Sequence, residues 1–357
     1  MTSVAIIGLG AAADHIHLPA YALLRGQMRV VGACDPDPQA RERARRKWRV
    51  PVFEDAQQML QQVHPEVVTV CTPPALHRDH ALLALSEGCH VFCEKPAAET
   101  LEQADEIARA AEAASRLVAV NTQFPSMRIH EAAKHAIGTP AFGKLVHLHV
   151  SHTMRTNDIT EAGWRGQLSR RLCFEFGVHV FELVRFLFGE NPVRLVAHMP
   201  GPGHQVACDM VNFVALEFAD GRGASILLDR LSQGPERYLD LRLDGETATV
   251  HTSIGGQLRL EAGMHTRERR PYLGFSFVKG GQARLEQGNR SKVIAQDGLN
   301  PFCDSTARHF SRFLQAIAHR GTPPGDIRDH RDTLALVIAA YDSAANRQWV
   351  EMSRYRR

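Results

Sequence analysis

Residues 3–13, SVAIIGLGAAA, decide the fold of this chain. An apolar run ends in glycine, and the segment from Gly8 to Ala13 fits the pattern G-x-G-x-x-A between a strand and a helix. In such a turn Gly8 permits the tight bend, Gly10 lets the backbone approach a pyrophosphate, and Ala13 keeps the helix close to the strand. The free N–H groups at the start of the helix then face the phosphates. The stretch predicts a dinucleotide-binding turn, with a glycine-rich hairpin as the alternative.

A carboxylate further along the chain decides against the hairpin. The apolar run from Met28 to Cys34 ends at Asp35, 22 residues after Ala13, where a spacing of about 20 places an acid on the adenosine ribose. A carboxylate there accepts both ribose hydroxyls and repels a 2′-phosphate, so we expect NAD rather than NADP. The basic run between positions 41 and 47 is expected on the solvated face of an outer helix. If those side chains fold back toward the ribose, NADP remains possible.

Composition excludes several classes of function. The chain has 357 residues, which suggests two domains, and its formal net charge of +3 argues against nucleic acid or an anionic membrane as partner. No apolar run approaches the roughly 20 residues of a membrane span, and the N-terminus lacks the features of a signal peptide. Seven scattered cysteines without a C-x-x-C pair suit a cytoplasmic protein with reduced thiols. Nineteen histidines come with no convincing third ligand, so no metal site is expected.

Strands and helices alternate through the first 122 residues, which predicts a doubly wound parallel sheet. The continuous apolar run 67–71 ends at the turn Thr72-Pro73-Pro74, and a helix follows over 75–86. The next apolar run ends at Cys93, so Glu94 and Lys95 emerge at the carboxyl end of a strand. Open α/β sheets bind ligands at that edge.

The second half reads as α+β. A helix is expected over 125–137 and another over 172–188, in which Glu175 and His179 are four residues apart and therefore share one face. Residues 261–300 show little periodicity and are expected to form long loops or an arm. Strands with turns between them predict an antiparallel sheet, over Leu145–His152, Val193–His198, Val211–Phe218, Gly223–Leu231, Tyr238–Leu243 and Thr247–His251.

Together these motifs resemble the Gfo/Idh/MocA oxidoreductases, which include glucose–fructose oxidoreductase and inositol dehydrogenase. The resemblance rests on GLGAAA at 8–13, Asp35, CTPPALH at 71–77, CEKP at 93–96 and VNTQF at 120–124. It continues through Trp164-Arg165, EFGVH at 175–179, NPF at 300–302 and the helix expected over 334–344, and so covers essentially the whole chain.

The resemblance implies a fold and an activity. We expect a Rossmann domain over residues 1–122 and an α+β domain over 123–357, whose large open antiparallel sheet pairs with a second copy in a homodimer or homotetramer. The Lys95-Pro96 peptide is a candidate for the cis isomer. The implied reaction transfers a hydride between NAD (NADP possible) and a secondary alcohol or ketone of a sugar, cyclitol or related polyol. The alternatives are a glycosidase or epimerase that uses NAD without net redox, and a non-catalytic NAD-binding regulator.

Roles for individual residues follow from the same resemblance. His179 is the expected general base, with a pKa near its ordinary value of about 6.5. Lys95 holds the reacting oxygen, and Glu175 orients the substrate or His179. The expected cofactor-binding residues are Gly8, Leu9, Gly10, Ala11, Ala12, Ala13, Asp35, Thr72, Pro73, Pro74, His77, Glu94 and Lys95. The expected substrate-binding residues are His152, Trp164, Arg165, Arg170 and Arg171.

Several of these assignments have alternatives. His77 fits a helix cap or a surface position as well as a place near the nicotinamide ribose, and His152 fits an exposed position. The pair Arg170-Arg171 stands where relatives carry a glycine-rich turn, and it suits either a carboxylate or phosphate grip or a solvated loop. Glu175 replaces the usual Asp, so the substrate cannot be carried over from the family.

Overall fold

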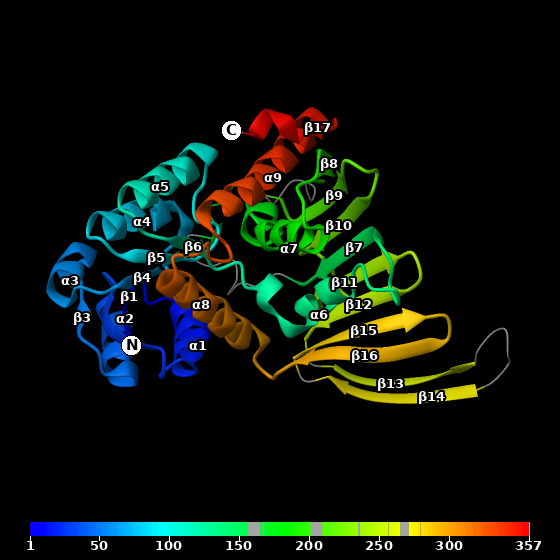
Figure 1. Cartoon of the computed structure of the whole chain (residues 1–357), viewed down its shortest axis with the longest axis horizontal. Helices are drawn as coiled ribbons and strands as arrows, with labels where there is room; N and C mark the ends of the chain where they lie inside the picture. The colour runs from blue at the N-terminus through cyan, green and yellow to red at the C-terminus, as the bar shows by residue number, and fades with distance from the viewer. Residues whose placement is uncertain are drawn as a thin grey trace.

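The computed structural model describes residues 1–155, 165–166, 168–200, 209–234, 236–255, 257–264, 271–278 and 280–356. The described residues form two large sheets with helices packed on them, and a separate two-stranded sheet (Figure 1). The first sheet contains six parallel strands in the order β3-β2-β1-β4-β5-β6, the order of a dinucleotide-binding doubly wound fold. Its strands are β1 (Thr2–Ile7), β2 (Met28–Cys34), β3 (Val52–Phe53), β4 (Val67–Val70), β5 (His90–Cys93) and β6 (Val118–Val120). The parallel doubly wound sheet predicted from the sequence is confirmed.

Helices cover both faces of this sheet because its strands are apolar on both sides. The helical elements are the π-helical segment η1 (Ala13–His17), α1 (Leu18–Ala22), α2 (Pro38–Trp48), α3 (Ala56–Val63), the 3₁₀ turn η2 (Pro74–Leu76), α4 (His77–Ser86) and α5 (Leu101–Ala113). Met59 of α3, Leu85 of α4 and Ile107 of α5 belong to one core, whereas Tyr21 of α1 and Ala40 of α2 belong to the core of the opposite face. The order reverses between β1 and β4, so their carboxyl ends form the ligand crevice expected in such sheets.

The second sheet has nine strands in the order β16-β15-β12-β11-β7-β10-β9-β8-β17. Its strands are β7 (Leu145–Thr153), β8 (Arg194–His198), β9 (Val211–Glu217), β10 (Gly223–Asp229), β11 (Arg237–Gly245), β12 (Thr249–Ile254), β15 (Gly281–Gln287), β16 (Arg290–Asp297) and β17 (Val350–Glu351). Every neighbouring pair is antiparallel except β7 and β10, which run parallel. The sheet that we expected to be antiparallel is therefore mixed at its centre. After β7 the chain crosses through α7 and forms β8 and β9 before it places β10 beside β7.

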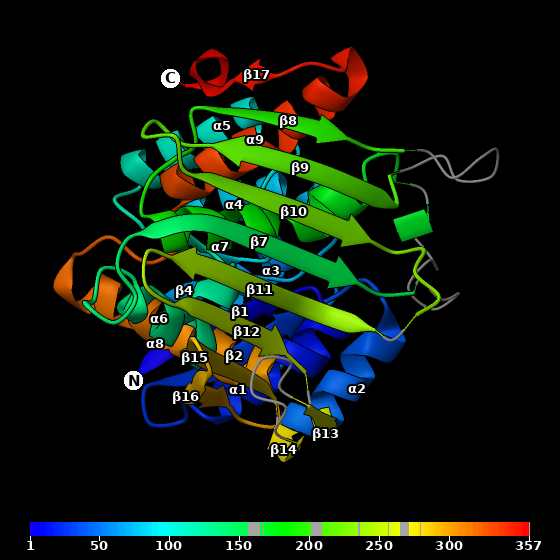
Figure 2. The same cartoon turned by 90° about the vertical axis from the view of Figure 1, so that its right-hand side faces the viewer.

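Helices lie against one face of the nine-stranded sheet, and Figure 2 shows the other face turned toward the viewer with the helices behind the strands. The remaining helical elements are the 3₁₀ turn η3 (Phe124–Ser126), α6 (Arg128–Ala136), the π-helical segment η5 (Cys173–Gly177), α7 (Val178–Phe188), α8 (Pro301–His319), α9 (Ile327–Asn346) and the 3₁₀ turn η6 (Met352–Tyr355). Among the helices of the described ranges, none is both long and apolar enough to cross a bilayer.

Helix α8 packs on the first sheet although it follows the second sheet in sequence. Phe310 and Phe313 of α8 contact Phe92 of β5, with ring centroids 5.0 and 5.6 Å apart. All three rings are fully buried. The chain thus passes back across the junction between the two sheets, which ties the nucleotide-binding half to the rest of the molecule.

Of the two alternatives expected for residues 261–300, long loops or an arm, the long loops are wrong. Strands β13 (Gln257–Met264) and β14 (Pro271–Val278) pair as a separate two-stranded sheet, and β15 and β16 extend the large sheet. Strand β16 is its edge strand, and residues 290–293 are exposed on both faces. Because no alternation of buried and exposed positions exists there, periodicity could not reveal the strand.

Candidate active site

A cavity of about 670 Å³ lies at the carboxyl ends of β1, β2, β4 and β5. Arg165 and Glu175 of the second half line it together with residues of the first sheet. The expected cofactor-binding residues that line it are Gly8, Gly10, Ala11, Ala12, Asp35, Thr72, Pro73, Pro74, His77, Glu94 and Lys95. The two others, Leu9 and Ala13, are buried in the core beneath the turn. The structure therefore brings most of the predicted residues into one cavity that spans both halves.

The glycine turn fits a dinucleotide. Gly8 has a φ of +93°, and a Cβ there would lie 2.7 Å from the carbonyl carbon of Cys71. A Cβ on Gly10 would meet no atom within 4 Å, which leaves open space at the position where a pyrophosphate approaches the backbone. The turn is also held to Asp35, whose Oδ2 accepts a hydrogen bond from the N–H of Leu9 at 2.8 Å. Open space at Gly10 and a carboxylate at Asp35 fit the chemistry of a pyrophosphate and a ribose.

One arginine of the basic run on α2 lies next to Asp35, whereas Arg45 and Arg46 pair with Glu42 on the same helix. Arg41 folds back, and its Nη1 donates to the carbonyl oxygens of Asp35 and Pro36 at 2.8 and 2.9 Å. Its Nη2 forms an ion pair with Glu54 at 3.2 Å. The carboxylate of Asp35 favours NAD, whereas the folded-back position of Arg41 is the arrangement in which we expected NADP to remain possible.

Glu94 is held at the bottom of the cavity by residues that the sequence reasoning missed. Its carboxylate is 2.7 Å from Nε2 of His17 and accepts a hydrogen bond from Nδ2 of Asn121 at 2.8 Å. Burial opposes ionisation, but these hydrogen bonds and the charges of His17 and Lys95 hold the pKa of Glu94 well below its ordinary value. His17 lies 77 positions away in the sequence, so no local pattern could have paired the two.

Lys95 follows Glu94 and reaches into the second half of the molecule. The Lys95-Pro96 peptide is cis, as predicted. The ammonium Nζ donates to the carbonyl oxygen of Glu175 at 2.8 Å. Burial lowers the pKa of Lys95, with the charges of Glu94 and Glu175 acting in the opposite direction. The side chain of Lys95 is thus held by the backbone of the second half, while its own backbone N–H donates to the carboxylate of Glu94 at 3.2 Å.

The segment before α7 departs from the single α-helix that we expected. Residues Cys173–Gly177 form a π-helical turn, in which the hydrogen bonds span five residues instead of four. The inference that Glu175 and His179 share a face depended on α-helical spacing, and no hydrogen bond between them is present. Glu175 instead pairs with Arg165 at 3.0 Å and with Arg171 at 2.9 Å.

His179 is the first-turn residue of α7 and lies in an aromatic enclosure. Its ring stacks on Phe124 at a centroid distance of 4.5 Å, and only 5% of the residue is exposed. Its Nδ1 is buried without a hydrogen-bond partner. The expectation of an ordinary pKa is wrong, because burial, aided by the charge of Lys95, lowers the pKa of His179 well below 6.5. The imidazole is therefore neutral at physiological pH.

His152 is not a surface residue. Its ring stacks on Phe176 at 3.7 Å, its Nδ1 donates to the carbonyl oxygen of Tyr238 at 2.5 Å, and its Nε2 accepts from Nε of Arg230 at 3.0 Å. Burial lowers the pKa of His152 to about 3, so it acts as a neutral acceptor that orients Arg230. Arg230 also lies close enough to Lys95 to lower its pKa. The sequence contained no signal for Arg230, which stands just after β10.

The remaining predicted residues differ in their placement. His77 is buried, and its two ring nitrogens lie 2.7 and 2.6 Å from the carbonyl oxygens of Pro96 and Thr72. His77 thus links the two loops that line the cavity. Neither of the expected alternatives, a helix cap or a surface position, describes it. Arg170 packs over the ring of Tyr341 at 5.7 Å and does not line the cavity. Trp164 lies outside the described residues.

A Rossmann sheet, a dinucleotide cradle and a lysine facing a second α+β half define a two-domain, dinucleotide-binding oxidoreductase. Comparison of the sequence with protein families identifies it more closely. Residues 2–122 match the profile of the oxidoreductase family with an NAD-binding Rossmann fold, GFO_IDH_MocA, and residues 130–251 match the GFO/IDH/MocA C-terminal domain. The chain belongs to the Gfo/Idh/MocA family, and NAD is its cofactor.

Individual relatives are more distant. The chain is 30% identical to the D-glucoside 3-dehydrogenase of Escherichia coli over 199 residues, which cover 54% of this chain and 56% of that protein. It is 25% identical to the D-apiose dehydrogenase of Paraburkholderia graminis over 98% of this chain and 89% of the relative. An oxidoreductase from Agrobacterium radiobacter, solved with NAD+, L-tartaric acid and magnesium, superposes with a TM-score of 0.83 at 19% identity over 99% of both chains.

Proposed function

We propose that this protein oxidises a secondary alcohol of a sugar or related polyol with NAD+, or catalyses the reverse reduction. The observation that carries the proposal is the position of Lys95. Its ammonium donates to the carbonyl oxygen of Glu175 on the second half, while its backbone N–H donates to the carboxylate of Glu94 on the nucleotide-binding sheet, and all three residues line the cavity. The relatives named as D-glucoside 3-dehydrogenase, D-apiose dehydrogenase and levoglucosan dehydrogenase support a carbohydrate substrate.

The protein's own residues divide the chemistry between them. Lys95 binds the reacting oxygen and stabilises the negative charge that develops on it when the hydroxyl loses its proton. His179, which is neutral in its enclosure, takes that proton as general base. NAD+ bound in the cavity supplies the hydride acceptor. Glu175 and Arg165, which line the cavity together with Lys95, orient the substrate, and Arg171 holds the Glu175 carboxylate in place.

The test is a thermal-shift screen followed by turnover. NAD+ and NADP+ are added first, and sugars, anhydrosugars, sugar acids and cyclitols are then added to the NAD+ complex, since a ligand that binds the native state raises the melting temperature. Each hit is assayed for NADH formation with the wild type and with Lys95→Ala and His179→Ala. We expect both variants to lose at least about 10²-fold in kcat, the lower range for a positioned proton-transfer group. Near-normal turnover by either variant would show that the assignment is wrong.

A second candidate uses the same residues without net redox. Two relatives that are 25% identical over about half of this chain are named 2,7-anhydro-N-acetylneuraminate hydratase, and hydration alone leaves the oxidation level of a sugar unchanged. Product that forms without stoichiometric NADH would favour this candidate over a dehydrogenase.

The cellular setting completes the proposal. We place the protein in the cytoplasm, where its buried free thiols Cys34, Cys71 and Cys303 stay reduced. We also propose that the open face of the nine-stranded sheet pairs with a second copy in a homodimer or homotetramer. Exposed apolar side chains on this sheet, Val146 and Phe213, support an interface. Sedimentation equilibrium tests the assembly, and a monomer at micromolar concentration would exclude it.

A further inference from the structure

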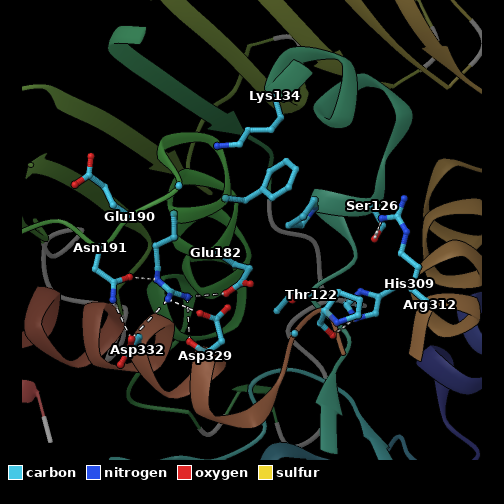
Figure 3. A pocket seen from close by; sticks show the side chains of 16 residues that line it. Thr122, Ser126, Lys134, Glu182, Glu190, Asn191, His309, Arg312, Asp329 and Asp332 are labelled. Carbon is cyan, nitrogen blue, oxygen red and sulfur yellow. Dashed lines mark hydrogen bonds and ion pairs between the residues drawn. The ribbon is translucent and has the colours of Figure 1, made fainter. Parts of the chain in front are cut away.

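A second cavity of about 510 Å³ shares no lining residue with the first. Figure 3 shows Glu182, Asn191, Asp329 and Asp332 grouped on one wall, with Thr122, Ser126, His309 and Arg312 on the other and Lys134 above them. The first wall belongs to α7, α9 and the turn between α7 and β8, and the second belongs to α8 and the segment after β6. Helix α7, whose first turn carries His179, borders the second cavity through Glu182 and Arg185, and Glu175, in the π-helical turn that leads into α7, lines the first.

A row of polar side chains, the polar seam, lies between α7 and α9 and reaches the second cavity at Glu182 and Arg185. His179, Glu182 and Arg185 follow one another at intervals of three residues, so they form a row along one side of α7. On α9, His330 and Thr333 have the same interval. Thr333 donates a short hydrogen bond to Oε2 of Glu182, and His330 lies close enough to His179 and Arg185 for their charges to interact. The seam is polar although it lies in the interior.

Glu182 occupies the middle of this seam. The residue is 6% exposed, and it lines the second cavity. Nη1 of Arg185 lies 3.4 Å from its Oε2, but that guanidinium also binds Asp329, Asn191 and Thr333 and is shared among them. Burial raises the pKa of Glu182 to about 7, against the opposing charge of Arg185. The charge of Asp329 on α9 also raises this pKa. The other ionisable groups that line the same cavity are Lys134 on α6, Glu190 after α7, His309 and Arg312 on α8 and Asp332 on α9. His179 stands three residues before Glu182 on α7, and His330 three residues before Thr333 on α9.

The proposed reaction requires a route for one proton. Oxidation of an alcohol releases a proton from the hydroxyl in every turnover, and His179 takes it. The burial of His179 and the neighbouring charge of Lys95 both disfavour the imidazolium. His179 must therefore pass the proton on before the next turnover, and its stacked, enclosed ring has little direct access to solvent.

We propose that Glu182 relays the proton from His179 to the second cavity, which serves as the proton exit of the active site. This inference rests on the proposed function. In the oxidative direction the substrate O–H bond breaks and His179 gains the proton, and the protonated His179 then returns to its neutral form as Glu182 becomes a neutral carboxylic acid. Glu182 releases the proton to water in the second cavity and becomes a carboxylate again. In the reductive direction each transfer runs in reverse.

The first arm of the test does not depend on catalysis. The infrared band of a protonated carboxyl is followed in the NAD+ complex of the wild type, Glu182→Gln and the control Glu190→Gln. Glu190 lines the same cavity but pairs with Arg222 outside the seam. We expect one band that titrates between about pH 6 and about pH 8, exchanges promptly in D2O, is absent in Glu182→Gln and persists in Glu190→Gln. A Glu182 that stays ionised throughout this range, or whose proton resists exchange, would overturn the relay.

The second arm uses a substrate that passes the thermal-shift and NADH screen. Glutamine retains an oxygen for the hydroxyl of Thr333 but cannot carry the proton. We expect Glu182→Gln to lower kcat about 10-fold or more with KM changed less than about twofold, since the loss lies in a proton-transfer step. In the wild type we expect kcat to decline below about pH 7, and this decline should be absent in Glu182→Gln. If Glu182→Gln kept the kcat and pH profile of the wild type, the relay would be refuted. If the wild type showed no turnover, the proposed function would be refuted, and the infrared result would decide the role of Glu182.

Discussion

Replacement of His17 by phenylalanine tests how the charged end of β5 is held. The change removes the hydrogen bond between Nε2 of His17 and Glu94 but keeps an aromatic ring against Phe92, which His17 contacts at a centroid distance of 5.9 Å. A hydrogen bond to a charged group contributes about 1.5–3 kcal/mol. Glu94 is only 8% exposed, so little solvent screening applies, and Asn121 remains as its second partner. We expect a coupling energy of about 2 kcal/mol between positions 17 and 94.

The assay is a double-mutant cycle. Melting temperatures are measured for the wild type, His17→Phe, Glu94→Gln and the double variant, and about 2 kcal/mol corresponds to roughly 4–8 °C for a domain of this size. The pKa of Glu94 is depressed in the folded state, so its stabilising effect is present above the ordinary value of 4.5 and is lost as the pH falls through the depressed value. The coupling should therefore be largest near neutral pH and shrink in acid. A coupling below about 0.5 kcal/mol near neutrality, or one that grows in acid, would refute this account of Glu94.

Three further predictions concern the same cavity. Gly8→Ala should abolish measurable NADH binding by fluorescence titration, because its Cβ would lie 2.7 Å from the Cys71 carbonyl carbon. Gly221→Ala is the matched control, since Gly221 has a similar φ of +85° but its Cβ would meet no atom within 4 Å, and this variant should bind NADH normally. Asp35→Ser should reduce the preference for NAD+ over NADP+ at least about tenfold in the ratio of the two Kd values, since the repulsion of a 2′-phosphate is removed; an unchanged ratio would exclude that role for Asp35. Arg171→Ala should lower the melting temperature by several degrees, since loss of a buried pair costs about 3–5 kcal/mol. Arg170→Ala, the neighbouring control, should leave the melting temperature almost unchanged. Equal losses in the two variants would mean that the ion pair between Arg171 and Glu175 does not account for the stability.

The nucleotide-binding half was predictable because its information is local. The turn at Gly8 to Ala13, the acid at Asp35 and the strand end at Glu94 and Lys95 each carry a short signal with a physical reason. A strand covered on both faces also reads as a continuous apolar run, as in β4. The parallel sheet and most of the cofactor-cavity residues follow from those signals.

The substrate side could not be predicted in the same way. His17, which pairs with Glu94, Thr333, which pairs with Glu182, and Arg230, which pairs with His152, are all distant in sequence from their partners, so these pairings depend on tertiary packing. The π-helical turn before α7 changed the direction of Glu175, because helical spacing in a sequence does not distinguish four-residue from five-residue turns. The pKa of His179 depends on burial, which the sequence indicates only in outline. Edge strand β16 lacks the alternation that identifies strands.

The central claim is that Lys95 joins NAD chemistry to a carbohydrate alcohol. The most direct measurement is the stoichiometry of NADH and oxidised product formed by the wild type and by Lys95→Ala from a sugar that stabilises the NAD+ complex. We predict one NADH for each oxidised product in the wild type, and a loss of at least about 10²-fold in kcat in the variant together with retained NAD+ binding. Equal turnover by the two proteins, or product that forms without NADH, would contradict the claim.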